Sequence, residues 1–553
     1  MDTLICAGGS GSRVLEAVVH LCAAGLGPPK LRVFVIDPDS TNGSLEKTRL
    51  LIEHYRALHD IYASGPAADA GDYFSTQFDL VLPAGGLQRW SPVKDGQDFG
   101  TVLNYHALDD PQKEIVRLFF TQNELDMKMD VGFRGHPALG AAALSLLPLY
   151  QNAADASLWS AFHGALKNDV TTKANVMIVG SVFGGTGASA IHPLVRYLRN
   201  RDLLETNAEN LKVGAVALVP YFQFVAVKSD QLTSKDIEEA AHSEDFPLAS
   251  RSAAEYYDHL YGNEDWDFDA MYWIGDDTLA DVKYSIGGSS QANPAHFVDL
   301  LAALACFDFF SHAPHANAPA NSQAGAAGAQ QQNSNGAMPQ GECWYCGPEV
   351  VADAPQNTLS WDDLPIRGNV FQFSREQLRK RLHVFQMAAI SHLSFFGPLL
   401  KDSRLKDHPY MVPWYLERFG RENDRLSGGS NDDDLTKLAT YWEEEYLPWW
   451  QQIHAGSSGV QLFNTAAWGG GKPPISPNPD RLGNLLHPDE SHHDLSIVDE
   501  LFAGMVAVAR SGSGVPEGLS PAQRYLKMLA YASSPIVDRV QQQKSTQQQK
   551  PRA

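Results

Sequence analysis

Short, continuous apolar runs alternate with helical patterns over the first 310 residues. The runs predicted to be buried strands cover residues 3–7, 31–36, 176–179, 213–220 and 270–274. The segments predicted to be helices cover residues 14–24, 46–58, 141–147, 188–198 and 252–261. Strands that are apolar on both faces and separated by helices predict a parallel sheet covered on both sides, which is an α/β fold.

The pattern changes after the last of these strands. Residues 294–310 are almost wholly apolar and predict a long helix buried in the middle of the protein. Residues 313–340 are rich in Ala, Asn, Gln and Gly and predict a flexible linker. Helical patterns return at 374–396, 441–450 and 498–508, so we expect a second domain that is helical or α+β.

Composition narrows the functional classes. The 553 residues carry a formal net charge of −22, which argues against a nucleic-acid groove and against binding to anionic membranes. No apolar run reaches the ~18 residues of a membrane-spanning helix, and the N-terminus lacks a basic leader. Five cysteines are too few for a disulfide framework in a chain of this length. These features favour a cytoplasmic protein with no membrane segment.

Two clusters contain residue types that bind metals. Cys343 and Cys346 form a lone C-x-x-C pair with no second pair, which favours a loop turn over a zinc or redox site. The stretch 487–494 is dense in His and carboxylates, but helix capping explains it more simply than metal ligation. We therefore expect no metal that is held by protein ligands alone.

The most informative stretch is residues 176–189, V-M-I-V-G-S-V-F-G-G-T-G-A-S. A predicted strand leads through Gly184, Gly185, Thr186 and Gly187 into a predicted helix. Glycines at such a corner let the backbone approach an anion, and the N–H groups at the helix start favour a phosphate. Considered by itself, this strand–glycine–helix segment can also be a tight turn that binds no ligand.

A second glycine corner lies at the start of the chain. The first predicted strand runs into Gly8, Gly9, Ser10 and Gly11, and the second ends at Asp37-Pro38-Asp39. A strand, glycine turn, helix, strand and acid also fit a dinucleotide site of the Rossmann type. In that alternative Gly9 and Gly11 face the pyrophosphate and Asp37 binds the ribose.

A third glycine loop spans residues 130–140, where Gly132, Gly135 and Gly140 surround Arg134 and His136. A glycine loop with one arginine before a helix can form a second phosphate-binding wall, with Arg134 as a charge-assisted donor. A surface turn with a solvated arginine is the alternative.

Together the loops resemble those of the tubulin/FtsZ superfamily. Residues 184–189, G-G-T-G-A-S, resemble the family motif G-G-T-G-x-G except at Ser189. Residues 8–11 resemble its first loop, G-G-x-G, and residues 37–39 its acidic loop. Residues 132–140 resemble the FtsZ loop G-A-G-A-N-P-x-x-G, with Arg134 and His136 replacing small and amide residues.

Two further segments resemble the base-binding part of FtsZ. Residues 274–277, I-G-D-D, resemble the strand end I-P-N-D, and Phe297-Val298-Asp299 resemble the start of the central helix. The resemblance implies GTP or GDP with Mg²⁺, and it implies Asp276 or Asp299 at the base. It implies a nucleotide site that comprises Gly8, Gly9, Ser10, Gly11, Asp39, Arg134, Gly135, Gly184, Gly185, Thr186 and Gly187.

The sequence pattern and the resemblance together predict a domain order. It consists of a nucleotide-binding α/β domain at 1–292 with an insertion at 60–130, a central helix at 293–312, a low-complexity linker at 313–342, a C-terminal domain at 343–540 and a disordered low-complexity tail at 541–553. In this family, hydrolysis is completed across a head-to-tail contact by acids after the central helix. The nearest candidates are Asp362 and Asp363, whose spacing differs from the family's N-x-D-x-x-D.

Three functions follow as hypotheses. The first is a tubulin-like GTPase that assembles head-to-tail into filaments, with partner proteins bound by the C-terminal domain. The second is a nucleotide-binding scaffold that does not polymerise. The third is an NAD-dependent Rossmann oxidoreductase, for which the sequence offers no catalytic residue.

Overall fold

The computed structural model describes most of the chain, with gaps. The described residues are 1–63, 72–82, 86–129, 132–133, 135–147, 157–200, 210–225, 243–263, 265–276, 279–283, 289, 291–312, 342–346, 373–401, 412–421, 425–426, 430–456, 462, 496–512, 515–516 and 518–548.

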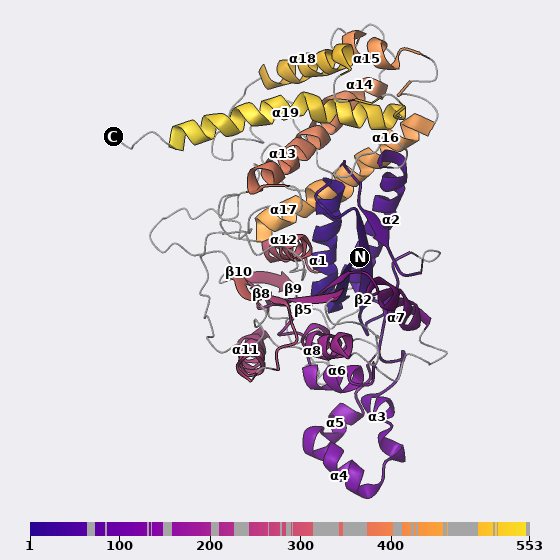
Figure 1. Ribbon diagram of the computed structural model, residues 1–553, viewed down its shortest axis with the longest axis vertical. Coiled ribbons are helices and arrows are strands. Elements are labelled where there is room, and N and C mark those ends of the chain that lie inside the picture. Colours follow the sequence, from indigo (N-terminus) through magenta and orange to yellow (C-terminus); the bar gives the residue numbers. More distant parts are fainter. Residues whose placement is uncertain are drawn as a thin grey trace.

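A parallel β-sheet forms the centre of the protein (Figure 1), and the predicted α/β fold is confirmed. Its strand order is β10-β8-β6-β5-β1-β2-β3, with β4 also paired to β2, and every described pairing in it is parallel. The strands are β1 (Asp2–Ala7), β2 (Lys30–Ile36), β3 (Gln77–Asp79), β4 (Arg89–Trp90), β5 (Ala174–Ser181), β6 (Leu211–Leu218), β8 (Ala270–Ile274) and β10 (Glu342–Cys346).

Both faces of the sheet are buried because successive side chains of a strand point to opposite sides. In β1, Leu4 and Cys6 belong to one apolar core, whereas Ile5 and Ala7 belong to another. Ile5 is in register with residues of both neighbouring strands, β2 and β5. The continuous apolar runs of the sequence are therefore explained by helices on both faces.

Each face carries its own set of helices. The first core includes residues of α1 (Gly8–Ala23), α2 (Gly43–Tyr62) and α12 (Phe297–His312). The second includes residues of α7 (Ser157–Asp169), α8 (Gly185–Arg199) and α11 (Phe246–Gly262). Helix α12 is buried without a break from Phe297 to Phe310, as its uniformly apolar sequence predicts.

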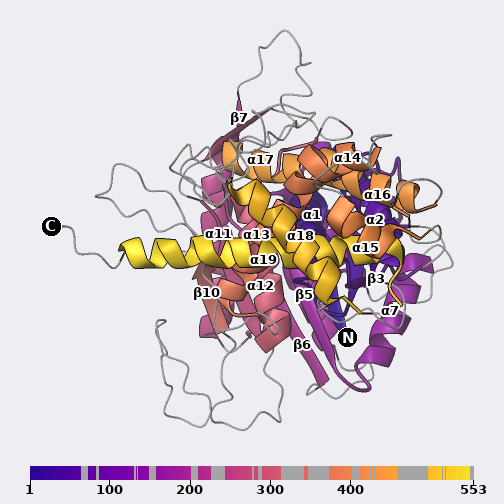
Figure 2. The same ribbon diagram turned by 90° about the horizontal axis from the view of Figure 1, so that it is seen from above.

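The chain after α12 is helical where the structure describes it, apart from β10. Its helices are α13 (Arg375–Ser391), η9 (His392–Phe396), α14 (Gly397–Lys401), α15 (Val412–Phe419), α16 (Ser430–Thr440), η12 (Tyr441–Tyr446), α17 (Leu447–Gly456), α18 (Ser496–Ser511) and α19 (Pro521–Gln548). They lie on the α1 side of the sheet, and the first apolar core continues into them without interruption (Figures 1 and 2).

A small subdomain projects from the opposite end of the protein (Figure 1). It contains α3 (Phe99–Val102), η2 (Tyr105–Ala107), α4 (Asp110–Phe119) and α5 (Gln122–Leu125) around a separate apolar core. The interval 60–130 also supplies β3 and β4 to the main sheet. Strands β7 (Phe222–Val225) and β9 (Ala280–Lys283) form a separate parallel pair.

Two local predictions need correction. Cys343 and Cys346 lie on strand β10, in register with β8, and not in a loop turn. Helix α2 begins at Gly43 and not at residue 46, because the Asn42 side chain accepts hydrogen bonds from the Ser44 and Leu45 amides and caps the helix.

None of the helices that the structure describes is both long and apolar enough to cross a membrane.

Buried histidines make the stability of this fold depend on pH. Burial lowers the pKa of His392 to about 4, and its Nδ1 lies 2.9 Å from the Tyr525 hydroxyl. The unfolded chain therefore binds a proton between about pH 4 and 6.5 that the folded chain does not, and folded stability falls as pH falls through this range. We expect His392→Gln to reduce the slope of unfolding free energy against pH by up to ~1.4 kcal/mol per pH unit, as measured by urea denaturation.

His106→Gln, at an exposed position, is the matched control for that measurement. If both variants have the same slope as the unmodified protein, the buried state of His392 does not determine the pH dependence.

Candidate functional site

The topology singles out one edge of the sheet. Strands β1 and β5 are neighbours at its centre, and the chain leaves β1 toward β2 on one side and β5 toward β6 on the other. In open α/β sheets, ligands bind where the strand order reverses in this way, outside the carboxyl ends of the strands. The predicted glycine loops at residues 8–11 and 184–187 follow β1 and β5 and therefore lie at this position. As a correction, residues 8–11 are the first turn of α1 and residues 185–187 the first turn of α8, so both helices begin earlier than residues 14 and 188.

Three helices begin at this edge without a side-chain cap. Helix α1 starts directly after β1 at Gly8, whose φ of +70° suits glycine, and its N-cap Ala7 offers no side-chain acceptor. Helices α8 and α6 (Pro137–Leu144) follow the N-caps Gly184 and His136, which make no side-chain capping bond either. The first N–H groups of a helix have no intrahelical partner.

The starts of α1 and α8 and the loop before α6 meet around Thr186. A Cβ added to Gly8 would lie 3.1 Å from the Thr186 Cβ, and one added to Gly132 would lie 3.9 Å from its Oγ1. A Cβ on Gly185 would lie 3.0 Å from the Gly135 amide nitrogen. The three predicted loops, far apart in the sequence, are therefore in direct contact.

Other glycines at this edge let the helices approach the strands. A Cβ on Gly11 would lie 2.9 Å from the Cys6 carbonyl carbon, and one on Gly187 would lie 2.4 Å from the Ser181 amide nitrogen. Real Cβ atoms essentially never come so close to backbone. These two positions are therefore explained by packing, and they bring the starts of α1 and α8 down onto the sheet.

Ser189, the departure from the family motif, has a structural account. Its hydroxyl donates to the Thr186 carbonyl at 3.0 Å. A Cβ on Gly140 would lie 2.2 Å from the Ser189 Oγ, so the glycine in α6 provides the space for the serine. The serine does not crowd the loop, because residue 140 has no side chain.

The acidic loop after β2 lies against the first glycine loop. A Cβ on Gly9 would lie 3.1 Å from the Asn42 Nδ2, and this amide donates to Asp37 at 3.2 Å. Asp37 also accepts from the Asp39 amide, and burial raises its pKa to about 7. Asp39 accepts from the Thr41 amide and is equally buried. The carboxylates therefore hold their own loop together, and Asp37 is not presented to a ribose.

Beneath the loops, a buried ion pair joins α1 to α12. The Arg13 Nε lies 3.6 Å from Asp299, and both side chains are almost fully buried. Asp299 also accepts from the Tyr221 hydroxyl at 2.9 Å and from the His296 amide at 2.9 Å. Arg13 donates to Ser10 at 3.2 Å, so the buried cation reaches the first glycine loop.

Burial shifts the protonation equilibria of this pair. Burial raises the pKa of Asp299, although Arg13 opposes that shift. Burial by itself lowers the pKa of Arg13, but Tyr221 and Asp299 together keep that pKa above its ordinary value. Because the protein engages both oxygens of Asp299, this carboxylate holds Arg13 and Tyr221 in position and is not presented to a base.

Asp276 lies nearby at the carboxyl end of β8. Its Oδ2 is 3.9 Å from the His296 Nε2, and its side chain is 8% exposed. Burial and then Arg13 lower the pKa of His296 to about 4, which keeps that imidazole neutral at pH 7. Of the two predicted base-binding carboxylates, Asp276 is therefore the one that is not completely buried, with Asp299 at 0%.

Several predicted residues lie outside the described part of the chain. They are Arg134, Asp277, Asp362, Asp363, the linker at 313–340 and the cluster at 487–494. Among the residues that are described, no group of three or more His, Cys, Asp or Glu is arranged to hold a metal ion.

Three residues of the site were missed by the sequence analysis. Asn42 was detectable, since asparagine before a helix is a typical N-cap. Arg13 was a weaker signal, a single charge directly after the glycine turn in a mostly apolar helix. Tyr221 had none, because its contact with Asp299 depends on how β6 and α12 pack.

No protein-family model matches the chain, and no curated protein sequence matches it.

The Arg13–Asp299 pair gives a stability prediction. Removing one partner leaves a buried charge without compensation, so we expect Arg13→Met and Asp299→Leu each to lower the unfolding free energy by ~3–5 kcal/mol. The double variant loses less than the sum, because neither charge then remains. Urea denaturation of the unmodified protein, the two single variants and the double variant measures the interaction energy between the two side chains. Additive losses of unfolding free energy would show that they do not interact.

Proposed function

We propose that the protein binds GTP at the carboxyl edge of the sheet, across the three glycine loops. The observation that carries this proposal is the contact around Thr186 of the uncapped starts of α1 and α8 with the loop that leads into the uncapped start of α6. Each contributes unpaired N–H groups and the positive end of a helix dipole. A ligand with several phosphates satisfies all three at once.

The residues around the convergence fit a polyphosphate. Amides of residues 8–11 and 184–187 and the hydroxyls of Ser10 and Thr186 supply donors, and Arg13 supplies a nearby positive charge. Mg²⁺ usually binds through substrate phosphates and few protein ligands, so the lack of a described carboxylate cage is compatible with a nucleotide-bound ion. Such an ion would neutralise phosphate charge when bound.

Asp276 supports guanine over adenine. A carboxylate accepts hydrogen bonds from both N1–H and the exocyclic amine of guanine, whereas adenine has no such donor pair on that edge. The engagement of Asp37 by its own loop argues against the NAD alternative, which needs that acid at the ribose.

The tubulin/FtsZ resemblance extends the proposal to assembly. We propose that copies of the chain associate head-to-tail, with Asp362 and Asp363 of one copy completing the nucleotide site of the next. A heterologous contact of this kind is open-ended and forms filaments. A nucleotide-binding scaffold that does not assemble is the alternative.

Nucleotide analysis of the purified protein tests the binding proposal. We expect denaturation to release a guanine nucleotide, and we expect Thr186→Ala to weaken GTP binding by ~10-fold or more through loss of a hydroxyl donor to phosphate. Thr186→Ser keeps that donor and should bind nearly normally. Calorimetric titration measures the affinities for GTP, ATP and NAD. Release of NAD, and not of a guanine nucleotide, from the purified protein would reject the proposal.

A pair of glycine substitutions tests the role of the loop contact. Gly185→Ala places a methyl group against the backbone at Phe133 and Gly135, so it must separate the two loops and weaken GTP binding. Gly164→Ala, in helix α7 with no atom within 4 Å of the new methyl, is the control and should bind GTP normally. Equal affinity for both variants would mean that the loops do not act together on a ligand.

Sedimentation with GTP and Mg²⁺ tests assembly separately from binding. We expect pelleting that rises above a critical protein concentration and is absent in Thr186→Ala. If the protein binds GTP and stays in the supernatant at every concentration, the scaffold alternative holds and the filament proposal fails.

A further inference from the structure

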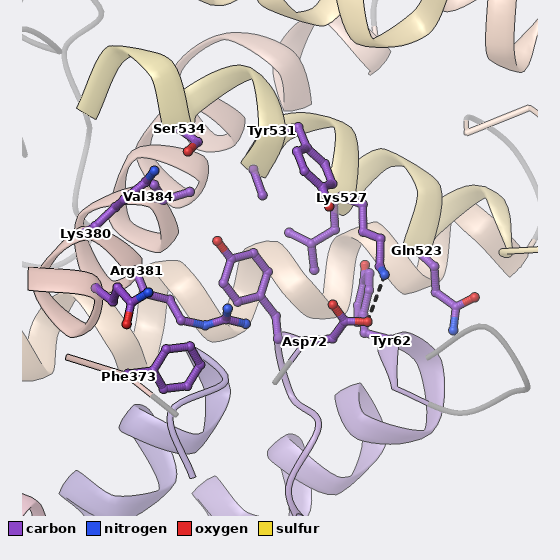
Figure 3. Close-up of a pocket in the computed structure, with 14 residues that line it drawn as sticks. Tyr62, Asp72, Phe373, Lys380, Arg381, Val384, Gln523, Lys527, Tyr531 and Ser534 are labelled. Carbon is purple, nitrogen blue, oxygen red and sulfur yellow. Dashed lines mark ion pairs between the residues drawn. The ribbon is translucent and has the colours of Figure 1, made fainter. Parts of the chain in front are cut away.

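A pocket of about 300 Å³ lies far from the glycine loops, between the C-terminal helices and the α2 side of the sheet (Figure 3). Helices α13 and α19 form two of its walls, and the end of α2 with residues 72–73 forms another. Its volume is at the lower end of the range for small-molecule sites. Its lining combines aromatic rings with one acid, Asp72, and three basic side chains, Lys380, Arg381 and Lys527.

Arg381 is held in a fixed orientation in this pocket. Its Nε donates to the Ala24 carbonyl at 2.7 Å, at the C-terminal end of α1. Its guanidinium carbon lies 5.3 Å from the ring centre of Tyr73 and 5.2 Å from that of Phe373. One hydrogen bond and two rings therefore fix the plane of the guanidinium, and no described residue accepts a hydrogen bond from its Nη atoms.

Among the described residues, Lys527 and Lys380 each form an ion pair, whereas Arg381 forms no salt bridge and interacts electrostatically with Asp72. Lys527 lies 2.8 Å from Asp72, and Lys380 lies 2.7 Å from Asp538. Within the described part of the chain, no carboxylate lies within ion-pair distance of Arg381, and its Nη atoms have no hydrogen-bond acceptor. Burial lowers the pKa of Arg381, and Tyr73 and Asp72, which line the same pocket, partly oppose that shift.

We propose that this pocket binds a small organic anion, a carboxylate or phosphate on an apolar body, with Arg381 as its bidentate partner. A fixed guanidinium fork matches the two oxygens of such a group. The apolar side chains of Val384, Leu526 and Ala530 line the same pocket and can contact the body of the ligand. Lys527 and Lys380 line the same pocket, but each is paired with a carboxylate, so Arg381 is the cation that we assign to the ligand.

The site is independent of the proposed nucleotide site. Arg381 binds the end of α1, and the glycine loop lies at its start, ~24 Å away for 16 residues of α-helix. A variant at Arg381 therefore tests this pocket without removing any group from the loops.

Titration of the full chain with benzoate, phenyl phosphate and neutral benzamide, followed by ligand-observed NMR, tests the proposal. We expect at least one of the two anions to bind ~10-fold or more tightly than benzamide, and Arg381→Lys to weaken that binding ~10-fold by removing the fork while keeping the charge. Preference for benzoate identifies a carboxylate ligand, and preference for phenyl phosphate identifies a phosphate.

Arg379→Lys, on the same helix but outside the pocket lining, is the control and should bind the anion normally. GTP binding by Arg381→Lys should equal that of the unmodified protein, which separates this result from failure of the nucleotide proposal. Three results would overturn the inference: benzamide binds as well as the anions, Arg381→Lys has no effect on anion binding, or neither anion binds at millimolar concentration.

Discussion

Helix α1 imposes the constraint on which the rest of this structure depends. It is buried along nearly its whole length, yet it carries Arg13, Glu16 and His20, which cannot be left without partners in an apolar interior. Each of them is paired with a different element. Arg13 contacts Asp299 of α12, the Glu16 carboxylate lies 2.6 Å from Lys47 of α2, and the His20 ring nitrogen lies 3.0 Å from the Tyr441 hydroxyl of η12.

This arrangement explains why the C-terminal helices lie on the α1 side of the sheet. The His20 ring packs 4.7 Å from the centre of the Trp449 ring, and Arg381 of α13 donates to the end of α1. An arginine there also interacts favourably with the negative end of the helix dipole. The first apolar core therefore runs from the sheet through α1 into α19, and the two halves of the chain fold against one another.

The sequence predicts the parts of the fold that depend on local patterns. Strands β1, β2 and β5 and helix α12 are close to their predicted positions because long apolar runs identify them. Strands β3, β4 and β10 were not predicted, since each has only two to five residues and forms by pairing with a distant strand. The sequence did predict that the glycine loops lie together, because their order along an α/β fold puts them at the same edge of the sheet. The sequence could not predict that Asp299 forms an ion pair and accepts a hydrogen bond inside the protein, because its partners Arg13 and Tyr221 come from other elements.

The glycines at the sheet edge support nucleotide binding only weakly, because several of them have a packing role. Gly11, Gly140 and Gly187 are required by close packing against strands or Ser189, and that packing would be present without any ligand. The uncapped helix starts are different, because parallel strands and close packing bring α1 and α8 to this edge but do not require their first N–H groups to lack a side-chain cap. Away from this edge α4 and α13 have side-chain caps, whereas α11 begins without one. A missing cap is therefore not specific by itself, and the proposal of an anion depends on several uncapped helix starts lying together.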